Sequence, residues 1–321
     1  MAVLVYAENW DGQFKKLSFE LVSYASKVAE MMNTTTSVVS IGNVDDAELA
    51  NLGNYGASKV LKVEGASFSS IDGQVFTNIV AQAAQAEGAD IIILSHNNSG
   101  KAIAPRLSVK LKAALGSALT KLPSSASPFT VTKKVFTGKA TADVVLNTEV
   151  KVLTLAQNSF EVIETGGEAT VETFAAEVGE IKTVVKDVQK QTGKILLNDA
   201  DIVVSGGRGM KSADNWGVIE ELADLLGAGT ACSRPVSDEG WRPHGEHTGQ
   251  TGKIIAPNLY IAAGISGAIQ HLAGVSSSKC LVAINTDADA PIFEAADYGI
   301  VGDALKVLPD FVNAVKEAKA K

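Results

Sequence analysis

The alternation of short apolar segments with amphipathic ones constrains the fold of this chain more than any other feature. Short apolar segments, typical of buried strands, occupy residues 3–7, 36–42, 59–63 and 90–95, and the last of them is a continuous apolar strand. Between the first two runs, apolar residues recur at helical spacing and predict one buried helix face, made of Phe19, Val22, Ala25, Ala29 and Met32. A second helix is expected to begin at Asp72, a good N-cap, and to stop at Gly88. This alternation predicts an α/β fold, with a mainly parallel sheet covered by helices on both faces.

The pattern is interrupted once, which predicts two domains. Three β-rich runs between about 128 and 165 are expected to form antiparallel strands, at residues 129–138, 142–147 and 150–157. Residues 171–194 are then expected to be a connector. The alternation restarts at residue 199, with candidate strands at 201–205, 259–264 and 280–284 and helices beginning near Asp214, Gly267 and Ala304. We therefore expect two doubly wound domains, 1–189 and 190–321, with ligands above the carboxyl ends of the strands.

Charge and composition exclude several functions. A formal charge of −8 and a pI near 5.1 argue against a nucleic-acid partner, which needs clustered basic residues. No apolar run reaches the ~18 residues of a membrane span, so direct membrane insertion is not expected. Two distant cysteines disfavour a disulfide framework or a zinc site, and no metal is expected. The N-terminus has no presequence pattern, which predicts a cytoplasmic protein, or a mitochondrial matrix protein only if a transit peptide was removed.

Residues 261–274, IAAGISGAIQHLAG, predict a bare turn between a strand and a helix. Gly264, Ser266 and Gly267 remove bulk from this turn, so backbone N–H groups would face a ligand above it. An anion or an electron-rich ring edge suits such donors. His271 lies one turn into the helix and could reach the same ligand. The alternative is a core histidine whose ring is satisfied by a carbonyl.

Two other glycine-rich segments are candidate ligand loops. Residues 205–212, SGGRGMKS, lack the third glycine of the dinucleotide fingerprint, but Arg208 could bind a phosphate; the alternative is a tight turn with positive φ and a solvated arginine. Residues 248–253, TGQTGK, lack P-loop spacing and could either approach a flat heteroaromatic ring or form an ordinary loop. The nearby His244 and His247 are expected in a solvated loop rather than at a metal.

Four blocks resemble, in order and spacing, the FAD domain of the electron-transfer flavoprotein alpha subunit. They are SGGRGMKS, SRPVSDEGW, TGQTGKIIAPNLYIAAGISGAIQHLAG and VAINTDADAPIFEAADYGIVGD. The resemblance implies a DHS-like Rossmann domain that holds FAD and an N-terminal domain that contacts a beta subunit, with AMP as a candidate ligand of that subunit. It further implies an electron carrier without its own substrate site. Electrons would come from dehydrogenases such as acyl-CoA dehydrogenases of fatty acid β-oxidation, and pass singly toward a membrane quinone oxidoreductase.

The same resemblance assigns the FAD-binding residues. Arg234 would lie near the isoalloxazine, Thr251 at N5/O4, His271 at O2, and Asn285 and Asp303 with Ala304 at the adenosine end. The full set is Arg208, Ser233, Arg234, Thr248, Gly249, Gln250, Thr251, Ser266, Gly267, Ala268, Ile269, Gln270, His271, Asn285, Asp303 and Ala304. The chain departs from the family pattern at Thr248, which replaces a valine, and after Arg234.

Two other functions stay open from the sequence. One is a subunit of a bifurcating complex that oxidises NADH, in which a second flavin would belong mostly to the beta subunit. The other is a nucleotide-binding module without redox activity.

Overall fold

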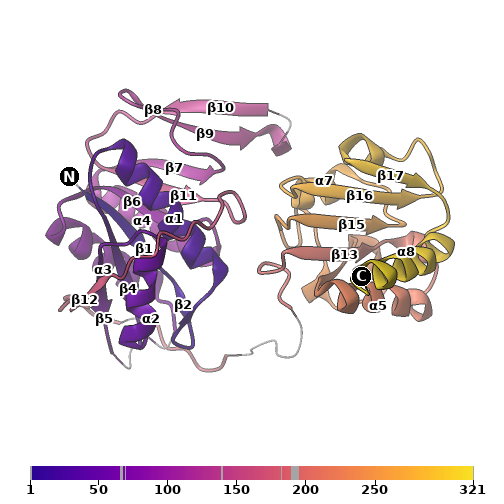
Figure 1. Ribbon diagram of the computed structural model, residues 1–321, viewed down its shortest axis with the longest axis horizontal. Helices are drawn as coiled ribbons and strands as arrows, with labels where there is room; N and C mark the ends of the chain where they lie inside the picture. Colours follow the sequence, from indigo (N-terminus) through magenta and orange to yellow (C-terminus); the bar gives the residue numbers. More distant parts are fainter. Residues whose placement is uncertain are drawn as a thin grey trace. The chain divides into compact units, whose positions relative to one another are not determined.

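The computed structural model describes residues 2–65, 68, 70–138, 140–181, 183–188 and 195–320. The chain forms two compact units, Met1–Val188 and Gln189–Lys321 (Figure 1). The predicted boundary between 189 and 190 falls on residues outside the described part of the chain. Each unit is built on a mainly parallel sheet between helices, so the predicted α/β class with two doubly wound domains is confirmed.

The N-terminal sheet has the strand order β10-β9-β7-β11-β6-β1-β4-β5-β12. Its parallel strands are β1 (Ala2–Tyr6), β4 (Thr36–Ile41), β5 (Lys59–Val63), β6 (Ala89–Ser95), β7 (Ala114–Leu119), β11 (Lys151–Leu155) and β12 (Thr170–Thr173). Strand β1 is buried on both faces, which explains its continuous apolar sequence. Val3 and Val5 pack in the core that contains α1 (Lys16–Met31), whereas Leu4 and Tyr6 pack with α3 (Gly73–Ala86) and α4 (Asn98–Leu111).

The predicted helices of this unit are present. In α1, Val22, Ala25 and Ala29 are buried, and Phe19 and the C-cap residue Met32 pack partly buried against the same core. The Asp72 carboxylate caps α3 by accepting the N–H groups of Gln74 and Val75. Gly88 follows α3 with a φ of 58°. The unit also contains the short helix α2 (Asp46–Ala50) and the strands β2 (Asn9–Trp10) and β3 (Gln13–Phe14), which pair with each other.

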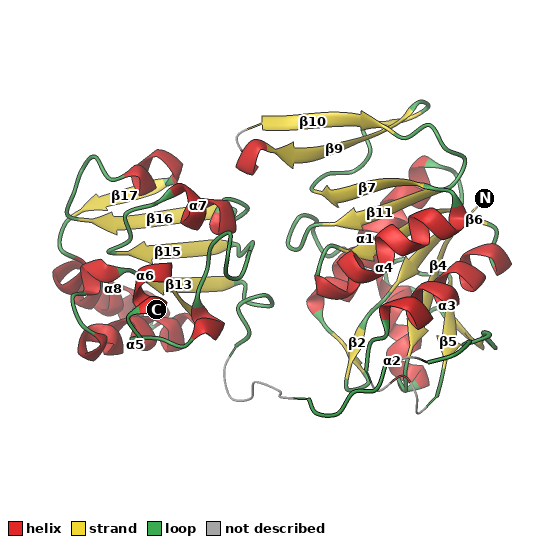
Figure 2. Ribbon diagram, turned by 180° about the vertical axis from the view of Figure 1, so that it is seen from behind, coloured by secondary structure: helices red, strands yellow, loops and turns green. Residues whose placement is uncertain are grey.

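The predicted antiparallel direction is wrong for one of the three strands. The first two are β9 (Phe129–Val135) and β10 (Ala140–Val145), which pair antiparallel at the sheet edge (Figure 2). The short strand β8 (Ser125–Ala126) pairs antiparallel with β9. The third, β11, instead lies parallel between β6 and β7. Its residues 152–155 are all buried, because a strand inside the sheet is covered on both faces. The predicted connector 171–194 also overlaps β12, which pairs parallel with β5.

The C-terminal unit contains a parallel sheet of order β14-β13-β15-β16-β17. Its strands are β13 (Ile202–Gly206), β14 (Gly229–Cys232), β15 (Leu259–Ala263), β16 (Cys280–Asn285) and β17 (Tyr298–Val301). The sequence predicted β13, β15 and β16, but not the shorter β14 and β17. Val204 packs on the face that carries α5 (Gly217–Leu226) and α8 (Ala304–Lys319), and Val203 packs on the face of α7 (Ile269–Val275).

The connections of this sheet create a switch point. The chain leaves β13 toward β14 on one side and then returns to β15 on the other side of β13. Loops that diverge in this way leave a crevice beyond the carboxyl ends of the strands. Helix α8 begins at Ala304 as predicted, whereas α7 begins at Ile269. The helix predicted near Asp214 begins instead at Gly217, after two 3-10 turns, Arg208–Met210 and Ala213–Trp216.

Across the described residues, no helix combines the length and apolar character needed to cross a membrane.

A buried carboxylate ties two distant segments of the N-terminal unit, and its loss should destabilise the fold. Glu20 of α1 is 1 % exposed and accepts the N–H groups of Asn158, Ser159 and Phe160 at 3.0, 2.7 and 2.9 Å. We expect Glu20→Ala to lower the free energy of unfolding by roughly 3 kcal/mol, because it leaves three backbone donors without an acceptor. Denaturant unfolding measures the effect.

The matched control is Glu30→Ala on the same helix. Glu30 is exposed and pairs only at the surface with Lys27, at 2.8 Å, so its removal should cost less than about 1 kcal/mol. Equal losses in the two variants would contradict the role of Glu20.

Candidate functional site

A cavity of about 450 Å³ lies at the carboxyl edge of the C-terminal sheet. It is lined by residues that follow four neighbouring strands: Arg208 after β13, Ser233 after β14, Ser266 after β15, and Asn285 at the end of β16. The cavity therefore occupies the crevice that the switch point creates.

Most of the predicted site residues line this cavity. They are Arg208, Ser233, Arg234, Thr248, Gly249, Gln250, Thr251, Ser266, Ala268, Gln270, His271 and Asn285. Four predicted residues do not: Gly267, Ile269, Asp303 and Ala304. Ile269 is 59 % exposed, and the Asp303 carboxylate caps α8 through the Leu305 N–H and pairs with Lys211 at 2.8 Å. Asp303 and Ala304 thus lie outside the lining and remain predictions as adenosine contacts.

The floor of the cavity depends on a close backbone contact between two loops. Gly264 has a φ of 64°, and a Cβ atom there would lie 2.8 Å from the Cα atom of Gly209. The Gly209 N–H donates to the Gly264 carbonyl at 3.0 Å. In the loop 205–212 the glycines do not have positive φ; Lys211 does, at 68°. The tight turn and the exposed arginine of the alternative are both present, but the positive φ lies at Lys211 and not at a glycine, and Gly209 is required by the approach of Gly264.

Two arginines give the cavity a positive rim. Arg208 and Arg234 are both exposed, and the Arg234 Nε lies 3.3 Å from the Asp238 carboxylate. The helix α7 begins beside the cavity, and its N-cap Ala268 provides no side-chain acceptor for the first N–H groups. This arrangement favours an anionic or electron-rich ligand.

His271 supplies the one buried polar side chain with an open hydrogen-bonding atom in the lining. It is 6 % exposed, its Nε2 lies 2.9 Å from the Tyr260 hydroxyl, and its Nδ1 has no hydrogen-bond partner among the described residues. Burial lowers the pKa of His271 to about 4, and the Thr248 backbone opposes the shift. The side-chain partner of the ring is a phenol, while the effect of the Thr248 backbone is that of a nearby carbonyl, so the alternative of a core histidine with a carbonyl partner stays open.

Five lining residues were not among the predicted site residues: Gly209, Pro235, His247, Gly264 and Ile265. The expectation that His247 lies in a solvated loop is wrong, since it is 8 % exposed. The following residue, Thr248, donates its N–H to the Cys232 carbonyl, which draws His247 against the end of β14. His244 is exposed, with its Nδ1 2.9 Å from Ser237 Oγ. A search of the described residues finds no group of His, Cys, Asp or Glu side chains that could hold a metal ion.

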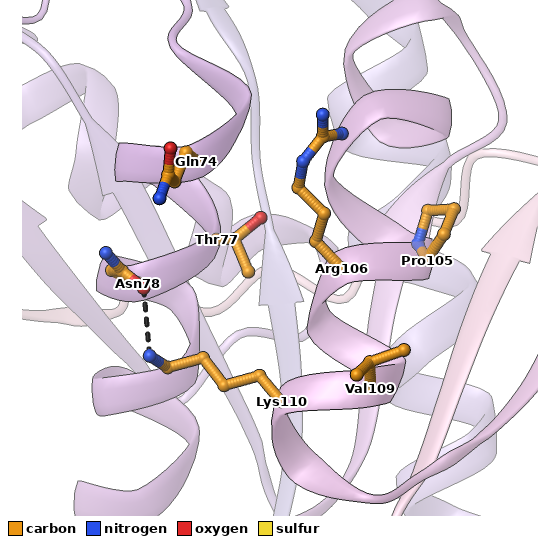
Figure 3. A pocket seen from close by; sticks show the side chains of 7 residues that line it. All are labelled: Gln74, Thr77, Asn78, Pro105, Arg106, Val109 and Lys110. Atoms are coloured by element: carbon orange, nitrogen blue, oxygen red, sulfur yellow. Dashed lines mark hydrogen bonds between the residues drawn. The ribbon is translucent and has the colours of Figure 1, made fainter. Parts of the chain in front are cut away.

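A second hollow, of about 630 Å³, lies in the N-terminal unit between α3 and α4. Figure 3 shows Gln74, Thr77 and Asn78 on one helix and Arg106 and Lys110 on the other, with Lys110 Nζ 2.9 Å from Asn78 Oδ1. This hollow is larger, but it lies on the flank of two helices rather than at the carboxyl ends of strands. It contains no buried polar atom without a partner among the described residues and none of the predicted site residues.

Comparison with known proteins assigns both units to one family. Residues 3–178 match the electron transfer flavoprotein domain, and residues 196–276 match the electron transfer flavoprotein FAD-binding domain. The chain is 38 % identical over 317 residues to the electron transfer flavoprotein subunit alpha of Syntrophomonas wolfei, with 98 % of each chain covered. It is 33 % identical to the same subunit of Bacillus subtilis, covering 98 % of this chain and 97 % of that protein. It is 35 % identical to the probable mitochondrial alpha subunit of Caenorhabditis elegans, covering 98 % and 93 %.

The contact between Gly264 and Gly209 should not tolerate a side chain. We expect Gly264→Ala to lower the free energy of unfolding by about 2 kcal/mol or more, because the new Cβ is strained at positive φ and also displaces the Gly209 backbone. Gly240→Ala is the control, since Gly240 has a φ of 75° but nothing within 4 Å of its Cβ position. Denaturant unfolding of the two variants separates the effect of the close contact from that of the strain. Equal losses of unfolding free energy in the two variants would contradict the role of the close contact.

The buried neutral His271 should make stability depend on pH. The pKa of His271 in the folded protein, about 4, lies below the ordinary value of about 6.5. The stability that the neutral ring contributes is therefore fully present above pH 6.5 and is lost as the pH falls through 4. The linked free energy is roughly 3 kcal/mol. Unfolding of wild type and His271→Gln between pH 7 and pH 4 should show a steeper loss in wild type. Parallel pH profiles would contradict a buried neutral His271.

Proposed function

Because the chain belongs to the electron transfer flavoprotein alpha-subunit family, we propose that it binds FAD in the cavity of its C-terminal unit and carries electrons as one subunit of a heterodimer. The beta subunit is the proposed partner of the N-terminal unit, with AMP as a candidate ligand of that subunit. On the resemblance alone, the proposal extends to dehydrogenase donors such as acyl-CoA dehydrogenases, to a quinone oxidoreductase acceptor and to a cytoplasmic location.

The observation that carries this proposal is the unsatisfied Nδ1 of His271 in the lining of the cavity. A buried polar atom without a partner is costly, and its retention is explained by a ligand that completes its hydrogen bond. The ring edge of FAD offers such acceptors. FAD also carries a diphosphate, which the exposed Arg208 and the backbone of the glycine loops suit. The residues present therefore fit FAD.

The roles of the chain's own side chains follow from their exposure. When bound, FAD supplies reversible electron transfer. Arg234 is 62 % exposed, so it would act on the ligand through hydrated charge at the rim. His271 would act at short range as a neutral group, because burial keeps it uncharged at pH 7. Asn285 already donates to the Ile265 carbonyl at 2.9 Å, and so supports the loop after β15 as well as lining the cavity.

Co-expression with the beta-like subunit tests the proposal directly. We expect the two chains to purify together, with the yellow absorbance of about one FAD for each heterodimer. A stable heterodimer without flavin, even after incubation with FAD, would contradict the proposal and favour a nucleotide-binding module without redox activity. Absence of association with the beta subunit would contradict the heterodimer.

The charge of Arg234 at the rim should contribute modestly to FAD affinity, and its contribution should depend on salt. We expect Arg234→Ala to weaken FAD binding roughly three-fold at low salt and less at high salt, because Arg234 is exposed and screened. Arg106→Ala, at an exposed arginine of the N-terminal hollow, is the matched control and should leave the affinity unchanged. Titration of the flavin-free heterodimer with FAD measures both. An effect of Arg234→Ala that does not depend on salt would contradict the electrostatic role.

A further inference from the structure

Tyr260 contacts His271 from the core of the C-terminal unit. It is the second residue of β15, is 0 % exposed, and packs in the core between the sheet and α7. Its hydroxyl lies 2.9 Å from His271 Nε2, and the two rings are 6.0 Å apart at an angle of 47°. A buried tyrosine hydroxyl normally has a hydrogen-bond partner, and here that partner is the imidazole.

The direction of this hydrogen bond decides what His271 can offer to a ligand. A neutral imidazole carries one proton, and the bond at one nitrogen determines which nitrogen holds it. If the phenol donates to Nε2, the ring proton lies on Nδ1, which is then a donor. If Nε2 donates to the phenol, Nδ1 is an acceptor and would repel an electron-rich ring edge.

Ser205 favours the first arrangement. It lies on β13, two residues after Val203, which is the register partner of Tyr260, and so points to the same face of the sheet. Its hydroxyl is buried and has no hydrogen-bond partner of standard geometry within the described chain. Burial raises the pKa of Tyr260, and the Ser205 and Thr248 hydroxyls oppose this rise, as donors to the phenol oxygen would. Thr248 already donates to the Cys232 carbonyl, at 3.3 Å, which leaves Ser205 as the hydroxyl without another acceptor among the described residues.

We propose that Tyr260 is a positioning residue: its hydroxyl donates to Nε2 of His271 and thereby fixes the ring proton on Nδ1, as a hydrogen-bond donor toward the ligand of the cavity. The proposal rests on the proposed function insofar as that ligand is FAD. In this proposal Ser205, which lies on the same face of the sheet and has no other acceptor among the described residues, would complete a relay as the donor to the Tyr260 hydroxyl. A donor fixed in this way stabilises an electron-rich form of the ligand over an electron-poor one.

The tautomer can be measured without any cofactor. This chain has four histidines, so ¹⁵N-histidine labelling of this chain alone, in a flavin-free heterodimer with unlabelled beta subunit, gives few signals, and His271→Ala identifies the signal of His271. We expect Nδ1 to be protonated and Nε2 unprotonated in wild type, and Tyr260→Phe to move the proton population toward Nε2. A wild-type ring protonated on Nε2 would overturn the proposal.

The potential of the bound flavin provides the second measurement. We expect Tyr260→Phe to lower the preference of the site for reduced over oxidised flavin about ten-fold, which for a two-electron couple is a fall of about 30 mV. The same substitution in the His271→Ala background should have no further effect, because Tyr260 acts through His271. An unchanged potential in Tyr260→Phe, or a fall that persists without His271, would overturn the proposal.

The controls separate a positioning role from a structural one. Tyr24→Phe removes another buried hydroxyl, which donates to the Lys121 carbonyl at 3.1 Å in the N-terminal unit, and should leave the tautomer and the potential unchanged. If Tyr260→Phe does not fold, Ser205→Ala and the wild-type spectrum decide: loss of the Ser205 donor should also move the proton toward Nε2, and no change would overturn the relay. A heterodimer that shows the expected tautomer but binds no flavin would contradict the proposed function while leaving the placement of the proton intact.

Discussion

The backbone contact between Gly209 and Gly264 is the constraint on which the rest of the C-terminal site depends. Gly264 donates its N–H to the Ile284 carbonyl of β16 and accepts the N–H of Gly209 from the loop after β13. One residue therefore joins the ends of three neighbouring strands. Because this contact needs no side chain, the residues that follow Gly264 can stay close to the sheet. The cavity then opens above them, and His271 enters it from the first turn of α7.

Burial determines what the histidine of this site can do. An ionised imidazole in the lining would have to be desolvated without an acidic partner among the described residues, and the low pKa of His271 expresses that cost. A neutral ring gives one donor and one acceptor, so its usefulness depends on which nitrogen holds the proton. The site therefore needs a second group to orient the first, and Tyr260 lies where such a group is required. The residue is invisible to motif reasoning, because a tyrosine in an apolar strand looks like core.

The sequence predicted the fold class and most of the lining, because both depend on local patterns. Continuous apolar runs identified β1 and β15, and glycine-rich turns after strands identified the loops that carry Arg208 and Ser266. The predictions that were wrong concern features that are determined by partners distant in the chain. The direction of β11 follows from its neighbours β6 and β7, and its own sequence is equally suited to either direction. The burial of His247 follows from the attachment of Thr248 to Cys232, which no spacing in a Pro- and Gly-rich loop reveals.

The site has charged side chains at its rim and a neutral polar side chain in its interior, and this arrangement has a physical reason. A guanidinium keeps its charge in any environment, so it is cheapest where water can reach it, and Arg208 and Arg234 are both exposed. Their attraction for an anionic ligand acts over a distance but weakens with salt. His271 is buried and neutral, so its single donor acts only on an atom in contact, and salt does not screen it. On the proposed function, affinity for the ligand and preference for its electron-rich form would therefore be controlled by different residues, and substitution could change either without the other.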